Sequence, residues 1–225
     1  MNTPLYSQLL KYASNQGLRL HMPGHIGGPG FAADAFKALA ALDVTEVPGL
    51  DGLHAGQGVI EEARRLLARA YGARESFFLV NGASSGVHAL FMALKGPDAK
   101  ALVPRNCHRS FFAGMVMAGT NPVYIPCQVN YEIGAALSVL PADVEGLLDI
   151  HHDAQAVFIT SPSYYGTTCR ITEIAAVCQK YDKPLLVDEA HGTHFYFGEN
   201  MPVSAMAAGA AAVAAAANGA AAMRL

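Results

Sequence analysis

After residue 75 the sequence alternates between short apolar runs and longer amphipathic segments, and this alternation constrains the fold more than any other feature. The apolar runs predict strands, and the segments between them have the periodicity and length of helices. Strands joined by helical crossovers predict a mainly parallel sheet covered by helices on both faces, which is a three-layer α/β fold. The predicted strands are SFFLV (76–80), ALVP (101–104), PVYIP (122–126), AVFIT (156–160) and PLLVD (184–188).

The residues before this alternation predict two helices separated by loops. PLYSQLLKYAS (4–14) has apolar residues at helical spacing, and VIEEARRLLARAYG (59–72) is an amphipathic helix with a Glu61–Arg65 pair and Gly72 as its end. We therefore divide the chain into an N-terminal helix with loops, a large domain and an alanine-rich tail. The predicted bounds are 1–57, 58–204 and 205–225.

Composition excludes several classes of function. A formal charge of -3 provides no basic field for nucleic acid or an anionic membrane. The four cysteines form no CxxC pair, so neither a zinc site nor a disulfide framework is expected. The N-terminus lacks the pattern of an export signal, and no run of 18 apolar residues occurs before residue 200. We expect a cytoplasmic protein with a small-molecule ligand.

Polar residues follow four of the predicted strands. Gly82-Ala83-Ser84-Ser85 lies between a strand and a helix, where free N–H groups, two hydroxyls and the helix dipole can hold a phosphate; the alternative is an ordinary N-cap at Ser84 or Ser85. The other groups are His108, the pair Ser161 and Ser163, and Asp188. Each alone has a structural interpretation, but in open α/β sheets these ends meet in one crevice.

The segment DEAHGTH (188–194) has two rival interpretations. An ATPase needs a GxxxxGK[ST] loop, which the sequence lacks. A metal site with Asp188, His191 and His194 has plausible ligand types and stays a minor alternative. Pyridoxal phosphate agrees best with the whole set, because it needs a phosphate cradle, a carboxylate at its pyridinium nitrogen and a flat side chain over its ring.

Six motifs in order then resemble the Orn/Lys/Arg decarboxylase family of the aspartate aminotransferase superfamily, and most closely its shorter Gram-positive-type arginine and lysine decarboxylases. The resemblance covers residues 4 to about 210. It implies the large domain of a fold type I enzyme that uses pyridoxal 5'-phosphate, decarboxylates a basic amino acid to a polyamine precursor, and acts as a cytoplasmic homodimer. The motifs are HMPGHIGG, LDVTEVPGLDGLH, FFLVNGASSGVHAL, VPRNCHRS, ITSPSYYG and PLLVDEAHGTHF.

The resemblance also implies a role for each matching residue. Asp188 pairs with the pyridine nitrogen, Ala190 packs under the ring and His108 stacks on the other face. The cofactor's phosphate binds Ser84 and Ser85 together with the backbone of Gly82 and Ala83, and Ser161 or Ser163 lies near its phenolic oxygen. His191 faces the substrate, and Glu46 and His54 are weaker candidates for the rim of the cleft.

The tail departs from the family's pattern. Thirteen of residues 205–222 are alanine, which predicts either a solvent-facing helix or linker, or a core strand that has lost its original side chains. The family's Schiff-base lysine belongs to an S-x-H-K segment, with which Ala216, Ala217, Asn218 and Gly219 align. No lysine follows Lys183. We expect an inactive or incomplete decarboxylase; the alternatives are a lysine-less cofactor-binding or partner protein, and another fold type I lyase or aldolase.

Overall fold

The structure is a computed structural model that describes residues 2–15, 17–215 and 220–223. The chain divides into two compact units, Met1–Leu67 and Ala68–Leu225. The first unit contains α1 (Pro4–Ala13), α2 (Asp34–Leu42) and most of α3 (Val59–Tyr71). The sequence predicts α1 and α3, and both are confirmed; α2 was not predicted.

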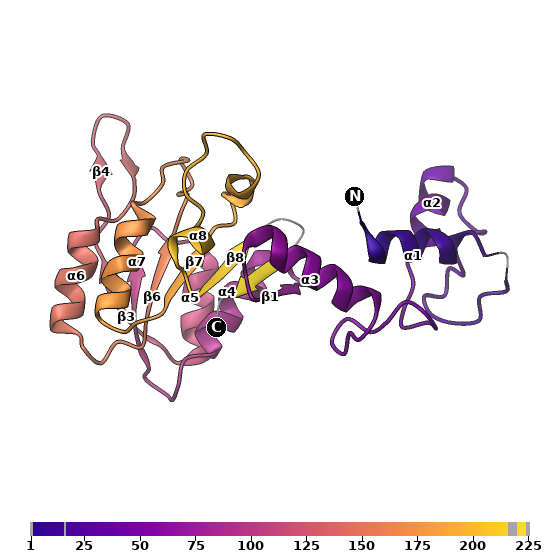
Figure 1. The fold of residues 1–225 in the computed structure, drawn as a ribbon, viewed down its shortest axis with the longest axis horizontal. Helices are drawn as coiled ribbons and strands as arrows, with labels where there is room; N and C mark the ends of the chain where they lie inside the picture. Colours follow the sequence, from indigo (N-terminus) through magenta and orange to yellow (C-terminus); the bar gives the residue numbers. More distant parts are fainter. Residues whose placement is uncertain (1, 16, 216–219, 224–225) are drawn as a thin grey trace. The chain divides into compact units, whose positions relative to one another are not determined.

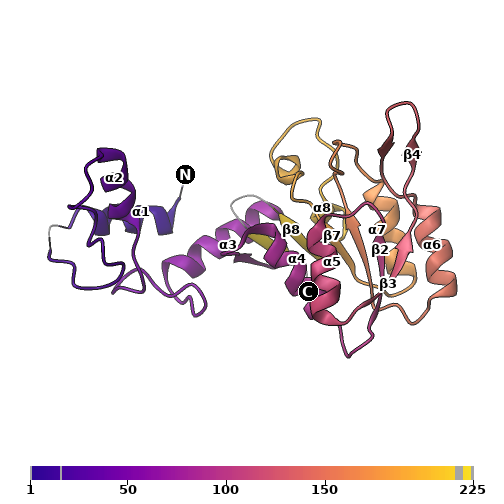
Figure 2. The same ribbon diagram turned by 180° about the vertical axis from the view of Figure 1, so that it is seen from behind.

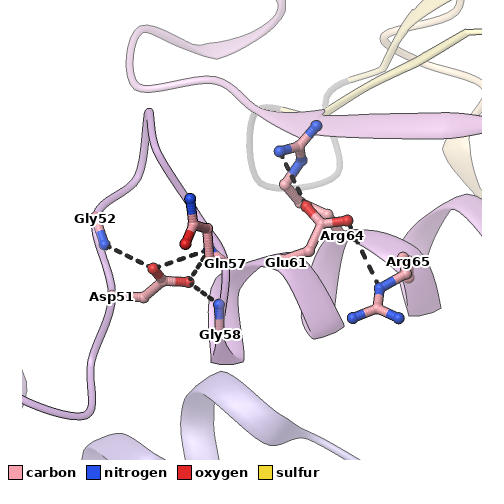
Figure 3. Close-up of polar contacts among 7 residues, drawn as sticks. All are labelled: Asp51, Gly52, Gln57, Gly58, Glu61, Arg64 and Arg65. Carbon is pink, nitrogen blue, oxygen red and sulfur yellow. Dashed lines mark hydrogen bonds and ion pairs between the residues drawn. The ribbon is translucent and has the colours of Figure 1, made fainter.

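The carboxylate of Asp51 accepts several backbone hydrogen bonds from the segment that precedes α3. Asp51, at φ 68°, accepts hydrogen bonds from the backbone N–H groups of Gly52 at 3.1 Å, Gln57 at 3.0 and 3.1 Å, and Gly58 at 2.8 Å (Figure 3). The bonds from Gln57 and Gly58 hold the pKa of the Asp51 carboxyl below its usual value. Asp51 thus satisfies N–H groups where α3 begins, which is the task of a helix cap.

The surface of α3 carries the predicted ion pair. Glu61 lies 3.6 Å from the Arg65 guanidinium and 3.2 Å from that of Arg64 (Figure 3). Gly72 follows the helix at φ 63°, a left-handed conformation that suits glycine and ends the helix where the sequence predicts. Exposed pairs of this kind contribute only a few tenths of a kcal/mol, about 0.3–0.5 for an i,i+4 pair, so α3 depends mainly on its packing.

The second unit is built on a seven-stranded sheet in the order β1-β9-β8-β7-β6-β2-β3. Adjacent strands pair in parallel from β3 to β8, and β9 pairs antiparallel with both β8 and β1. A mainly parallel sheet is therefore confirmed. All five predicted strands are present: β1 (Glu75–Phe78), β2 (Lys100–Pro104), β3 (Asn121–Ile125), β6 (Ala156–Thr160) and β7 (Leu185–Asp188). A small hairpin, β4 (Val129–Asn130) with β5 (Ala135–Ala136), was not predicted.

Helices cover both faces of this sheet. Figure 1 shows α6 (Pro141–Ile150) and α7 (Ile171–Lys180) in front of it, and Figure 2, from behind, shows α4 (Gly82–Met92) and α5 (Arg109–Ala118) on the other face. All four helices occur where the sequence predicts them. Within the described ranges, no helix is long and apolar enough to span a membrane.

An aromatic cluster fills the core under α4 and α5. The rings of Phe91 and Phe158 stack at 3.9 Å, and that of Phe111 meets both edge-on. All three side chains are essentially inaccessible to solvent. A Cβ atom at Gly114 would lie 2.6 Å from the Phe91 ring, so a glycine on α5 lets the helix approach the cluster. This core fixes α4 and α5 against the strands whose ends form the site.

The alanine-rich segment completes the sheet. After the short helix α8 (Ala205–Ala208), β8 (Ala212–Ala215) pairs in parallel with β7 and is fully buried. The interpretation of this segment as a solvent-facing helix or linker is therefore wrong for residues 212–215, which form a core strand. β9 (Ala220–Met223) follows beside β8. Ala216, Ala217, Asn218 and Gly219, which align with the family's lysine segment, lie outside the described residues.

Candidate cofactor site

A cavity of about 450 Å³ lies where β2, β6 and β7 end and where α4 and α5 begin. A larger space, about 670 Å³, lies beside α7 and α8 at the opposite end of β7, and no predicted site residue lines it. The smaller cavity is therefore the candidate site. Its lining residues are Ala83, Ser84, Asn106, Cys107, His108, Arg109, Ser110, Thr160, Tyr164, Asp188, Ala190 and His191.

Six of the ten residues predicted to contact the cofactor line this cavity, and Gly82, Ser85, Ser161 and Ser163 do not. The six are Ala83, Ser84, His108, Asp188, Ala190 and His191. The hydroxyls outside it have other partners. Ser85 donates to the Gly82 carbonyl at 2.8 Å, Ser161 accepts the Cys169 N–H at 3.1 Å, and Ser163 bonds the Thr167 hydroxyl at 2.7 Å.

Glu46 and His54 belong to the first compact unit, and their role at the rim of the cleft stays a prediction. Among the described residues, no three His, Cys, Asp or Glu side chains gather as a metal site. Asp188, His191 and His194 therefore do not form the alternative metal site.

Two residues of the first turn of α4, Ala83 and Ser84, line the cavity. The helix begins at Gly82, at φ 68°, and its N-cap residue Asn81 makes no side-chain capping bond. Ser84 and Ser85 lie inside the first turn, so the alternative in which one of them is the N-cap is wrong. The first N–H groups of a helix lack intrahelical acceptors and carry the positive end of its dipole. An anionic group in the cavity would satisfy them.

His108 combines a structural role with a place in the cavity wall. It is the N-cap of α5, and its Nδ1 accepts the Ser110 N–H at 3.3 Å and lies 2.9 Å from the Ser110 hydroxyl. A backbone N–H can only donate, so Nδ1 is an acceptor and the ring hydrogen is on Nε2. The imidazole is therefore held in a fixed orientation and in one tautomer where it lines the cavity.

Asp188 is the buried carboxylate of the cavity. It is 7% exposed, and its Oδ1 accepts the Ala190 N–H at 3.1 Å. Burial raises the pKa of this carboxyl, while the Ala190 N–H and the nearby His108 and His191 partly oppose the rise. A buried carboxylate with unused acceptor capacity is stabilised by a cation or a charged N–H donor placed against it.

Thr160 and Arg109 are lining residues that the sequence analysis missed. The Thr160 hydroxyl is buried and has no hydrogen-bond partner among the described residues. Such a group is costly unless something bonds it. Thr160 is the last residue of β6, and that position is the signal that could have identified it. Arg109 is the first residue of α5, directly after His108, and adds a cation to the wall.

Comparison with solved structures defines the class of protein. The chain superposes on lysine decarboxylase A from Pseudomonas aeruginosa with a TM-score of 0.83 at 20% identity, over 98% of this chain and 34% of that one. The constitutive lysine decarboxylase of Escherichia coli gives a TM-score of 0.76 at 20% identity, over 100% of this chain and 36% of that one. The fold is thus that of the large domain of fold type I enzymes, as predicted.

Comparison of sequences gives the family. Residues 3–220 match the model of the Orn/Lys/Arg decarboxylase major domain, and the chain belongs to this family. It is 42% identical to the Bacillus subtilis protein YaaO, described as uncharacterized, over 93% of this chain and 44% of YaaO. It is 37% identical to an arginine decarboxylase of Halalkalibacterium halodurans, over 92% of this chain and 43% of that protein. The chain spans less than half the length of these relatives.

Family membership implies pyridoxal 5'-phosphate as the cofactor, and the cavity residues fit this group. The N–H groups of α4 suit the phosphate, and the Asp188 carboxylate suits a protonated ring nitrogen. The unpartnered Thr160 hydroxyl offers a further hydrogen bond. Within the described ranges the buried Thr160 hydroxyl has no partner of its own, as expected of a group in a site for a polar ligand.

Proposed function

We propose that this chain forms the pyridoxal-phosphate-binding part of a decarboxylase that acts on a basic amino acid. The observation that carries the proposal is the meeting of the α4 N-terminus, the His108 ring and the buried Asp188 carboxylate in one cavity. Several relatives are named arginine or lysine decarboxylase, which supports this substrate class. These names do not distinguish arginine from lysine or ornithine.

Each lining residue takes a defined task in this proposal. Ser84 and the first N–H groups of α4 hold the phosphate, and the His108 imidazole covers one face of the ring. Asp188 bonds the pyridine nitrogen and Ala190 packs on the opposite face. Thr160 takes the place of Ser161 and Ser163 as the hydroxyl that bonds the cofactor, because it lines the cavity and has no partner among the described residues, whereas the two serines do not line the cavity.

The same residues define what the site does for the reaction. Pyridoxal phosphate, when bound, supplies an electron sink for the charge left when CO₂ departs. Asp188 keeps the ring nitrogen protonated, which maintains that sink, and His191 lies on the substrate side. The product is an amine of the polyamine precursor type. We propose a cytoplasmic homodimer as the working form of the whole protein.

The sequence favours a specific variant of this proposal. Gly219 stands where the family's lysine is expected, and no lysine follows Lys183. A lysine at this position binds the cofactor covalently and exchanges it with the substrate. We therefore propose that this chain binds the cofactor reversibly and has little or no turnover. A non-catalytic binding or partner protein is the second candidate, and the same substitution favours it.

The test is a titration of the purified chain with pyridoxal phosphate, followed by absorbance, borohydride reduction and intact mass. We expect reversible binding without a reducible adduct. Asp188→Asn should weaken binding about 10- to 150-fold, the equivalent of about 1.5–3 kcal/mol for a charged hydrogen bond. Asp34→Asn, at a side chain that is 95% exposed on α2, is the matched control and should change nothing.

Two outcomes would contradict the proposal. Equal affinity of the wild type and Asp188→Asn would place the cofactor elsewhere. A reducible adduct on one of the existing lysines would show that another amine replaces the missing one, and would restore the expectation of an active decarboxylase.

A further inference from the structure

A second carboxylate follows Asp188 and points away from the cavity. Glu189 is 2% exposed and is among the most deeply buried side chains of the described residues. Its Oε2 accepts the Tyr196 hydroxyl at 2.6 Å, and its Oε1 accepts the Ala205 N–H at 2.8 Å. Neither the sequence motifs nor the proposed cofactor contacts assign a function to Glu189.

The partners of Glu189 belong to the segment that leads into β8. Ala205 is the first residue of α8, and the Tyr196 hydroxyl in turn accepts the N–H of Met206 at 3.4 Å. One carboxylate and one phenol therefore satisfy two N–H groups at the start of α8, which would otherwise have no acceptor in a buried region. These hydrogen bonds join the carboxyl end of β7 to the start of α8.

The turn after β7 is packed closely around the Glu189 side chain. A Cβ atom at Gly192 would lie 2.7 Å from Glu189 Cγ and 2.8 Å from Pro162 Cδ, so the turn has no room for a larger residue. The Gly192 N–H also donates to the Glu189 carbonyl at 2.9 Å. A movement of the Glu189 side chain would therefore displace the turn that carries Asp188 and His191.

The groups that face Glu189 are phenols. The Tyr196 ring lies 4.2 Å from the ring of Tyr71, and the Tyr196 hydroxyl donates to the Glu189 carboxyl. Burial raises the pKa of Tyr71, and the charge of Glu189 adds to this rise. Burial raises the pKa of Glu189 to about 7, with the Tyr196 hydroxyl and the Ala205 N–H opposing the rise. Its protonation thus changes near neutral pH, which makes this carboxyl detectable without any cofactor.

We propose that Glu189 is a positioning residue of the cofactor site. Through Tyr196 and the start of α8 it fixes the turn of residues 188–192, so that Asp188 and His191 face the cavity. It also ties this turn to the segment that enters β8. The identity of the ligand in this inference rests on the proposed function. The positioning of the turn by Glu189 does not require the ligand and can be tested on the cofactor-free chain.

The experiment compares Glu189→Gln and Tyr196→Phe with Glu199→Gln, an exposed glutamate in the same segment. Amide NMR of the cofactor-free chain reports the position of the turn at Ala190 and His191. We expect both test variants to shift these two amide signals and to weaken pyridoxal phosphate binding about two- to tenfold, the range for one neutral hydrogen bond. The control should do neither.

The pH dependence of unfolding separates this role from general packing. Because the folded pKa of Glu189 lies above its usual value of 4.5, the folded state holds the proton more tightly than the unfolded state. The contribution of the protonated Glu189 carboxyl to the free energy of unfolding is fully present below about pH 4.5. This contribution is lost as the pH rises through about 7. Glu189→Gln should remove this decline, and Glu199→Gln should keep it.

The outcomes distinguish the two proposals. If the wild type does not bind the cofactor but the two amide signals move in both test variants, the proposed function fails and the positioning role stands. If the wild type binds and both variants bind equally well with unchanged amide signals, the positioning role is overturned. If Glu189→Gln does not fold, Tyr196→Phe decides, because it removes only the bonds that the hydroxyl makes with Glu189 and the Met206 N–H and leaves the ring in place.

Discussion

β7 and β8 are neighbouring parallel strands with the same burial and very different side chains. Leu186 pairs with Ala212 and Asp188 with Ala214, and all four residues are buried. β7 ends in the carboxylate of the candidate site, whereas β8 consists of alanines and one valine. A strand can therefore keep its place in a sheet through backbone pairing and burial while it contributes no chemistry to the sheet's edge.

This difference divides the site into two parts. In the proposed site, the groups at the carboxyl ends of β1, β2, β6 and β7 supply the phosphate cradle, the imidazole, the hydroxyl and the carboxylate. The segment after β8, where the family's lysine is expected, has no lysine. We infer that non-covalent recognition of the cofactor and covalent chemistry are separable in this chain.

The largest expected effect comes from Gly219→Lys, which returns the missing amine after β8. We expect a borohydride-reducible adduct with pyridoxal phosphate at close to one per chain, where the unmodified chain forms none. Intact mass and peptide mapping measure it. Ala207→Lys, at an exposed position of α8, is the control and should form no adduct. Adducts in both variants would indicate nonspecific reaction, and none in either would contradict the alignment of residue 219 with the family's lysine.

The second prediction tests whether β8 packs as well as β7. Val187 and Val213 pair in register and are both fully buried, so the same substitution to alanine removes the same atoms from neighbouring strands. Each should lower the free energy of unfolding by about 2 kcal/mol, about 0.8 for each lost methyl group plus a cavity cost. Urea denaturation measures both.

Val116→Ala provides the control for this pair, because Val116 is 83% exposed on α5 and its loss should change stability by less than about 0.5 kcal/mol. A cost at Val187 without a cost at Val213 would show that β8 occupies its position without forming part of the core.

The smallest expected effect concerns Ser110, which holds the His108 ring. Ser110→Ala removes the hydroxyl near Nδ1 and leaves the backbone N–H, so we expect a loss of about 1 kcal/mol in stability and a few-fold weaker cofactor binding. Long-range ¹H–¹⁵N NMR of the His108 ring should still find the hydrogen on Nε2, with altered ring shifts. Ser204→Ala, which removes the cap of α8, should cost similar stability and leave the His108 signals unchanged.

The sequence predicts the sheet and its four main covering helices because apolar runs of β-branched and aromatic residues alternate with helical segments. It leaves β8 as one of two alternatives for the alanine-rich segment, since alanine has neither the period nor the bulk by which a buried strand is recognised. The helix α2 was missed for a similar reason, because its DAFKALAAL sequence lies between two Gly/Pro-rich loops that suggest continuous irregular structure.

The candidate site was predictable at the ends of strands and less so in the turns beyond them. Asp188 and His108 stand at a strand end and a helix start, where pairing and capping fix their direction. Ser161 and Ser163 lie in a turn whose own hydrogen bonds engage their hydroxyls, and sequence alone does not specify those bonds. Thr160, one residue earlier, lines the cavity in their place.

The most direct test of the account is the ¹⁵N NMR signal of ring-labelled pyridoxal phosphate bound to the wild-type chain. The central claim is that the cavity holds this cofactor against Asp188 without a lysine. The account predicts a bound, protonated pyridine nitrogen, and a neutral nitrogen in Asp188→Asn. A bound cofactor whose ring nitrogen is neutral in the wild type, or the absence of any bound signal, would contradict it.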